Sequence, residues 1–148
     1  GEVLAIIGSV FLARKVGRNR PPYQVWAASM YCVSLNVLYL SSTLYHAFFA
    51  LGRTTVYVFS ILDYSGIFLL IAGSYSPILG IALYDEWYAA VLLLLLWATA
   101  FIGMCTAAFL TGPWAIPVRL SLYITMGWCI LVCIRPLARR LGPRGTLL

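Results

Sequence analysis

Charged side chains are scarce in this sequence. They make up 9% of its 148 residues, whereas 63% of the residues are hydrophobic. A chain so poor in charge cannot cover a water-soluble domain with polar surface, which excludes an ordinary soluble protein. Because backbone polar groups in lipid must bond within the chain, we expect an all-α, polytopic transmembrane helix bundle. At about 20 apolar residues per crossing, the length allows about five spans.

Long polar linkers are also missing, so the apolar runs set the expected helices. The runs cover residues 3–13, 25–51, 55–83, 87–110 and 114–134. The first is too short to cross a bilayer and lacks the cleavage signal of a signal peptide, so we interpret it as the second half of a helix. We expect a single transmembrane domain over residues 1–148, and we interpret it as a fragment of a longer protein because a new apolar run starts at the tail.

Acidic residues are few, and the net charge is +6. Such an excess could indicate a nucleic-acid partner, but its distribution fits membrane topology better. Eight basic residues lie in the first connection and after the last run, against Arg53 and Arg119 at the other end: Arg14, Lys15, Arg18, Arg20, Arg135, Arg139, Arg140 and Arg144. The positive-inside rule then makes the first connection and the tail cytoplasmic. We expect no nucleic-acid partner, membrane lipid as the surroundings, and a plasma or bacterial inner membrane location.

The chain has one histidine, His46, and one acid inside its apolar runs, Asp63. Ionisable residues in a bilayer cost about 2.5–3.5 kcal/mol on insertion scales, so each is a functional-site hypothesis. The short turn at Gly52 makes their helices antiparallel neighbours, with His46 and Asp63 at depths of about 9 and 15 Å from the same end. They can meet directly or through water. Ser42 lies one helical turn before His46 and shares its face.

Several interpretations of this trio stay open on spacing alone. A serine hydrolase would use His46 as base and Asp63 as orienter, but no Gly-x-Ser-x-Gly elbow accompanies Ser42. A metal site suits an imidazole beside a carboxylate, although zinc normally needs three protein ligands. The pair could also simply lock the helical hairpin. Cys129 and Cys133, at i, i+4 spacing, lack a second pair or a nearby histidine and are more simply small hydrophobes.

The stretches "SSTLYHAF" and "LDYSGIFLLIAGSYSP" resemble the signature of the hemolysin III family. That family is related to progestin and adiponectin receptor proteins and to alkaline ceramidases. These proteins carry Ser-x3-His in the second of seven spans, Asp in the third and His-x3-His in the last. Ser42, His46 and Asp63 match the first two elements, and the likeness covers essentially the whole chain. The last two spans are absent, so about five of seven family helices are expected, the first incomplete.

The resemblance implies a role for each residue of the trio. His46 would be a zinc ligand, Asp63 the partner of the metal-bound water or the general base, and Ser42 a hydrogen-bonding support. Zinc is the expected cofactor of the complete protein, which would be a hydrolase of lipid amide or ester bonds. We do not expect this fragment to hold zinc tightly or to be active alone. The alternatives are a receptor or signalling protein with structural zinc, and a pore-forming hemolysin-like protein.

Three glycines recur every seven residues along the third run: Gly66, Gly73 and Gly80. Small residues at regular helical spacing indicate close helix packing in membranes more often than ligand contact. We therefore expect this face of the helix to lie directly against a neighbour.

Overall fold

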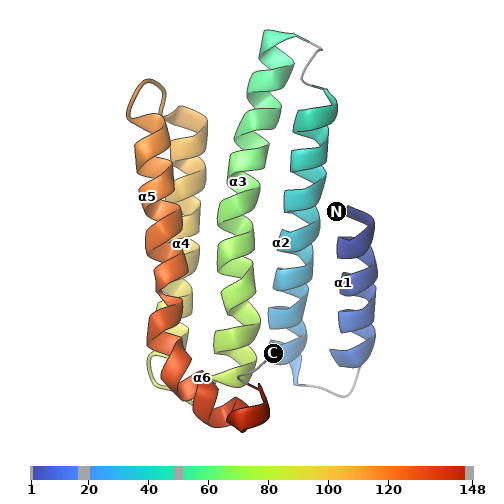
Figure 1. The fold of residues 1–148 in the computed structure, drawn as a ribbon, viewed down its shortest axis with the longest axis vertical. Helices are drawn as coiled ribbons and strands as arrows, with labels where there is room; N and C mark the ends of the chain where they lie inside the picture. The colour runs from blue at the N-terminus through green and yellow to red at the C-terminus, as the bar shows by residue number, and fades with distance from the viewer. Residues whose placement is uncertain (1, 17–20, 49–51, 146–148) are drawn as a thin grey trace.

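The computed structural model describes residues 2–16, 21–48 and 52–145, with side chains described for residues 2–14, 21–48 and 52–140. The described chain is helical throughout, apart from short connections. The helices are α1 (Glu2–Val16), α2 (Pro22–Ala47), α3 (Arg53–Pro77), the π-helical turn η1 (Ile78–Ala82), α4 (Ala89–Phe109), α5 (Ala115–Trp128) and α6 (Ile130–Gly145). Figure 1 shows α1, α2 and α3 side by side, with α4 and α5 on the other side of α3.

The predicted all-α membrane bundle is confirmed. Among the described residues, four helical segments are long and apolar enough to cross a membrane: Pro22–Ala47, Arg53–Ala82, Ala89–Phe109 and Ala115–Arg140. They coincide with the four long apolar runs of the sequence, and the short first run forms α1. Large apolar side chains such as Phe101 and Leu94 are exposed on the outer faces, as lipid contact requires. The protein is therefore an integral membrane protein.

The expected packing of the glycine face is confirmed, and α2 is the neighbour. A Cβ on Gly66 would lie 2.9 Å from Ser41 Oγ, one on Gly80 would lie 3.3 Å from Ala27 Cβ, and one on Gly73 would meet Ser34. Ala27, Ser34 and Ser41 repeat every seven residues, as the glycines do, but the two series run in opposite directions. The antiparallel helices thus meet along one seam of small residues, which lets their backbones approach closely.

Gly73→Ala is expected to destabilise the protein by about 1–3 kcal/mol, because the added methyl group would overpack the seam against Ser34. Gly8→Ala in α1 is the matched control, since a Cβ there meets nothing within 4 Å. The free energy of unfolding, measured by denaturing-detergent titration in micelles, would compare the two. Equal stabilities of the two variants would contradict close packing at this seam.

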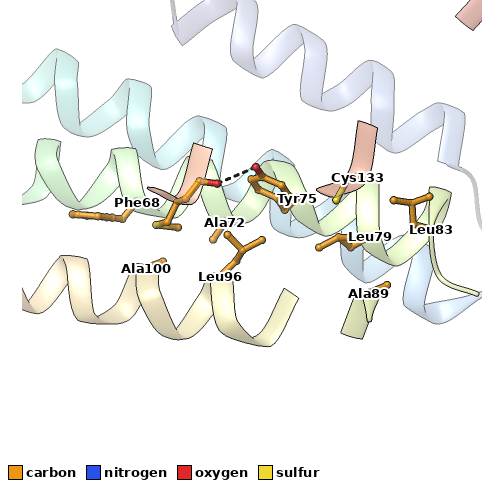
Figure 2. Close-up of a cluster of buried hydrophobic side chains, with 10 residues drawn as sticks. Phe68, Ala72, Tyr75, Leu79, Leu83, Ala89, Leu96, Ala100 and Cys133 are labelled. Atoms are coloured by element: carbon orange, nitrogen blue, oxygen red, sulfur yellow. Dashed lines mark hydrogen bonds between the residues drawn. The ribbon is translucent and has the colours of Figure 1, made fainter. Parts of the chain in front are cut away.

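The buried core lies between α3 and its neighbours α4 and α5. Figure 2 shows Phe68 and Ala72 of α3 beside Leu96 and Ala100 of α4, whereas Tyr75 points away from α4 toward α5. The Phe68 ring also packs on the Tyr123 ring of α5, with centroids 4.3 Å apart. These contacts fix α5 against the part of α3 that carries Asp63.

The fifth apolar run differs from the expected single helix, because α5 ends at Trp128 and α6 begins at Ile130. The single Tyr75 hydroxyl proton is shared between two carbonyl oxygens, that of Met126 at 2.9 Å and that of Gly127 at 3.0 Å from Oη (Figure 2 shows the first). A side chain of α3 thus adds a donor for carbonyls at the end of α5, where the regular intrahelical pattern stops. In Figure 1, α6 turns beneath the other helices after this break.

Candidate functional site

His46 and Asp63 lie at nearly the same level of the α2–α3 hairpin. Ser41 opposite Gly66 fixes the register of the two antiparallel helices. Because α2 and α3 run in opposite directions, a residue three positions before Gly66 in α3 is level with a residue three positions after Ser41 in α2. Asp63 is that residue of α3. His46 lies two residues further along α2, a difference in height of about 3 Å. Both residues belong to the half of the hairpin nearer the connection between α2 and α3, and that connection is uppermost in Figure 1.

The trio does not close into a directly bonded cluster. His46 is exposed, and its ring packs edge-on against Tyr45 with centroids 5.2 Å apart. Ser42 and Asp63 are half-buried. Within the described ranges, no ion pair of 4.0 Å or less joins His46 to Asp63. A direct His46–Asp63 pair that locks the hairpin is therefore not formed here.

The donors fit only part of a zinc site. In the part of the chain that the structure describes, no group of three or more His, Cys, Asp or Glu residues could hold a metal ion. His46 and Asp63 offer one imidazole and one carboxylate, whereas zinc normally takes three protein ligands. Cys129 and Cys133 do not add to this set, because Cys133 is buried in the core cluster and the Cys129 thiol donates to the Thr125 carbonyl at 3.4 Å.

Two residues of α5 contact the immediate neighbour of Asp63. Tyr123 Oη donates a hydrogen bond of 2.9 Å to the Tyr64 carbonyl. Arg119, one turn earlier, places its guanidinium 4.7 Å from the centroid of the Tyr64 ring, a cation–π contact. Its Nη2 also donates to the Leu110 carbonyl at 3.0 Å. The backbone segment that carries Asp63 is thus held between α2 and α5.

Sequence reasoning missed Arg119, which was counted only as a charge near a helix end. The structure places it half-buried in the candidate span Ala115–Arg140, with a buried Nε that has no hydrogen-bond partner among the described residues. The signal was available, because a guanidinium within an apolar run carries the same insertion penalty that drew attention to Asp63. Tyr64, the neighbour of Asp63, accepts a hydrogen bond from Tyr123 and packs against Arg119, both of α5.

An open groove of about 610 Å³ with a partly polar lining lies at the same end of the hairpin. It is lined by Tyr45, Gly52, Arg53, Val56, Tyr57, Ser60 and Tyr64. Tyr57 Oη donates to the Ala108 carbonyl at 3.2 Å, and Ser60 Oγ donates to the Tyr57 carbonyl at 2.7 Å. Since Asp63 lies one turn beyond Ser60 and next to Tyr64, the groove extends to the level of the candidate site.

Charges at the opposite end of the bundle have a structural role. Arg140 forms ion pairs with Asp85 at 3.2 Å and Glu86 at 3.6 Å, joining α6 to the connection before α4. A hydrogen bond with the Asp85 carboxylate raises the pKa of the Tyr84 phenol. These side chains are partly exposed, and such pairs contribute about 0–1 kcal/mol.

Comparison with known proteins identifies similar sequences. A family described as "Haemolysin-III related" matches residues 1–147. "Hemolysin-3" of Bacillus cereus is 35% identical over 145 residues, which is 98% of this chain and 64% of that protein. "Hemolysin-3 homolog" of Bacillus subtilis (strain 168) is 29% identical over 145 residues, 98% of this chain and 66% of that protein. The chain thus spans slightly less than two thirds of the length of these relatives. No solved structure matches it.

Proposed function

Since this chain belongs to the haemolysin-III related family, as the match over residues 1–147 shows, we propose that it forms part of a zinc-dependent membrane hydrolase that cleaves lipid amide or ester bonds. The observation that carries the proposal is the level shared by His46 and Asp63 within a membrane-spanning hairpin. Two ionisable side chains at one depth are costly in lipid, which favours a functional reason for both. A site between membrane helices suits a substrate that is itself a lipid.

The residues of this chain have distinct capacities in such a site. The exposed His46 imidazole can offer a ring nitrogen to a metal, and the Asp63 carboxylate can accept a proton from water. The Ser42 hydroxyl, one turn from His46, can donate a hydrogen bond to either. Bound zinc would supply Lewis acidity and a water with a pKa near 7. Because the described donors form only part of a zinc shell, the proposal requires further ligands beside His46.

The proposal is tested on protein purified at its natural length and loaded with zinc. We expect it to release fatty acid from an amide or ester lipid, to lose this activity on chelation and to regain it when zinc is restored. A protein that binds zinc stoichiometrically but cleaves no lipid of either class would overturn the hydrolase proposal.

The printed name of the Bacillus relatives keeps a pore-forming function as the second candidate. An aqueous pore needs a polar lining. The contacts of α3 favour the hydrolase, because its described faces pack on α2 through small residues and on α4 through an apolar core. Dye release from vesicles without any lipid cleavage would favour the pore instead.

A further inference from the structure

The groove at the start of α3 differs in chemistry from two apolar hollows lined by α4. A hollow beside α2 and α4 is lined by Trp26, Met30, Ala90, Leu93, Leu94 and Trp97. Another, on α4, is lined almost wholly by apolar side chains. Such surfaces suit acyl chains, which are present all around the protein. The α3 groove instead presents an arginine, three tyrosines and a serine, a lining that suits a polar ligand.

The charge of the groove indicates an anion. Arg53 is the one charged residue in the lining that the structure describes. A guanidinium has only donors, and its planar fork pairs best with carboxylate or phosphate oxygens. The hydroxyl protons of Tyr57 and Ser60 are already donated to backbone carbonyls, so the attraction for an anion comes from Arg53. Arg119, whose guanidinium lies over the Tyr64 ring, adds a second positive charge near the groove wall.

The position of the groove indicates a lipid as the source of that anion. Arg53 is exposed and is the first residue of the candidate span Arg53–Ala82, which starts at the upper end of α3 in Figure 1. The end of a membrane-spanning helix lies at the depth of lipid headgroups, where Arg and Tyr side chains anchor. We propose that this groove binds the phosphate of a membrane phospholipid.

The groove also bears on the choice of substrate. It reaches from Arg53 to Tyr64, the residue next to Asp63. A phospholipid held by its phosphate would bring the amide or ester bonds below its headgroup toward the level of Asp63. The favoured substrate is then a lipid that carries a phosphate rather than a neutral one. This extension to the substrate rests on the proposed hydrolase function, whereas the binding of phospholipid does not.

Binding is measured by native mass spectrometry on natural-length protein in mild detergent, titrated with phosphatidylglycerol, diacylglycerol or inorganic phosphate. All variants carry Asp63→Asn, so that hydrolysis cannot consume the lipid. Arg53→Gln is expected to weaken phosphatidylglycerol binding about fivefold, since one basic residue at a membrane surface contributes on that order. Arg53→Lys should restore most of the affinity. Arg135→Gln removes an exposed arginine from α6 and should leave binding unchanged.

Three results would overturn the phospholipid site. If Arg53→Gln and Arg135→Gln weakened phosphatidylglycerol binding equally, the effect would come from the general surface charge and not from the groove. If diacylglycerol bound with the same affinity as phosphatidylglycerol, the phosphate would not contribute to binding. Inorganic phosphate that binds as well as the lipid would identify a dissolved anion as the ligand. Selective phospholipid binding, together with no lipid hydrolysis by zinc-loaded protein that keeps Asp63, would uphold the groove and reject only the proposed function.

Discussion

Phe68→Ala is expected to lower the free energy of unfolding by about 3 kcal/mol, the low end of the range for such truncations in soluble cores. Phe68 is fully buried and packs on Tyr123 of α5. In a bilayer, the apolar surface gains little by leaving lipid, so the loss comes mainly from missing packing contacts. Phe101→Ala is the matched control because that ring is 65% exposed on the lipid-facing side of α4. Denaturing-detergent titrations would measure both variants.

The same contact can be tested from its other side. A Cβ on Gly103 of α4 would meet the Phe68 ring, so Gly103→Ala should cost about 1–3 kcal/mol through overpacking. Phe68→Leu makes room for that methyl group, and the double variant should therefore cost less than the sum of the two single changes. Strict additivity, or a Phe101→Ala cost equal to that of Phe68→Ala, would contradict the packing described here.

The membrane helices could be predicted because their signals are local. Runs of about 20 apolar residues between breakers such as Gly52 and Gly112 set the spans, and the observed helices follow them closely. The break at Cys129 could not be predicted in this way. It is accompanied by hydrogen bonds from Tyr75, a residue more than fifty positions away, to carbonyls at the end of α5. Which side chain reaches a helix end depends on the tertiary arrangement.

The candidate site was predictable in part for a similar reason. His46 and Asp63 stand out because ionisable groups in apolar sequence are costly, and the short connection places them at one end of a hairpin. The contacts of Tyr64 with Arg119 and Tyr123 require α5 to lie against α3, which no spacing within either helix specifies. Likewise, the glycine repeat of α3 predicted close packing against a neighbouring helix. The register between α2 and α3 could be assigned only from the structure, which places the glycines opposite Ala27, Ser34 and Ser41.

Asp63→Asn in zinc-loaded protein of natural length is expected to lower lipid hydrolysis by about 10²–10⁴-fold, the usual contribution of a general base. Asparagine keeps the shape of aspartate but cannot accept a proton, so hydrolysis falls. The zinc content should stay unchanged, because Asp63 is proposed as a base and not as a metal ligand. His46→Ala should instead reduce both zinc content and hydrolysis, because it removes a proposed metal ligand. Asp85→Asn, at the opposite end of the bundle, is the control and should leave both quantities intact. Metal analysis and turnover assays measure the two effects separately.

The contrast between the two variants distinguishes a catalytic site from a structural one. If His46 and Asp63 only stabilise the hairpin, both substitutions should lower the free energy of unfolding and leave turnover per folded molecule unchanged. The absence of a direct ion pair between them within the described residues makes a large stability effect unexpected. A His46→Ala protein that keeps its zinc and its activity but unfolds more easily would therefore reject His46 as a ligand and assign it to the stability of the hairpin.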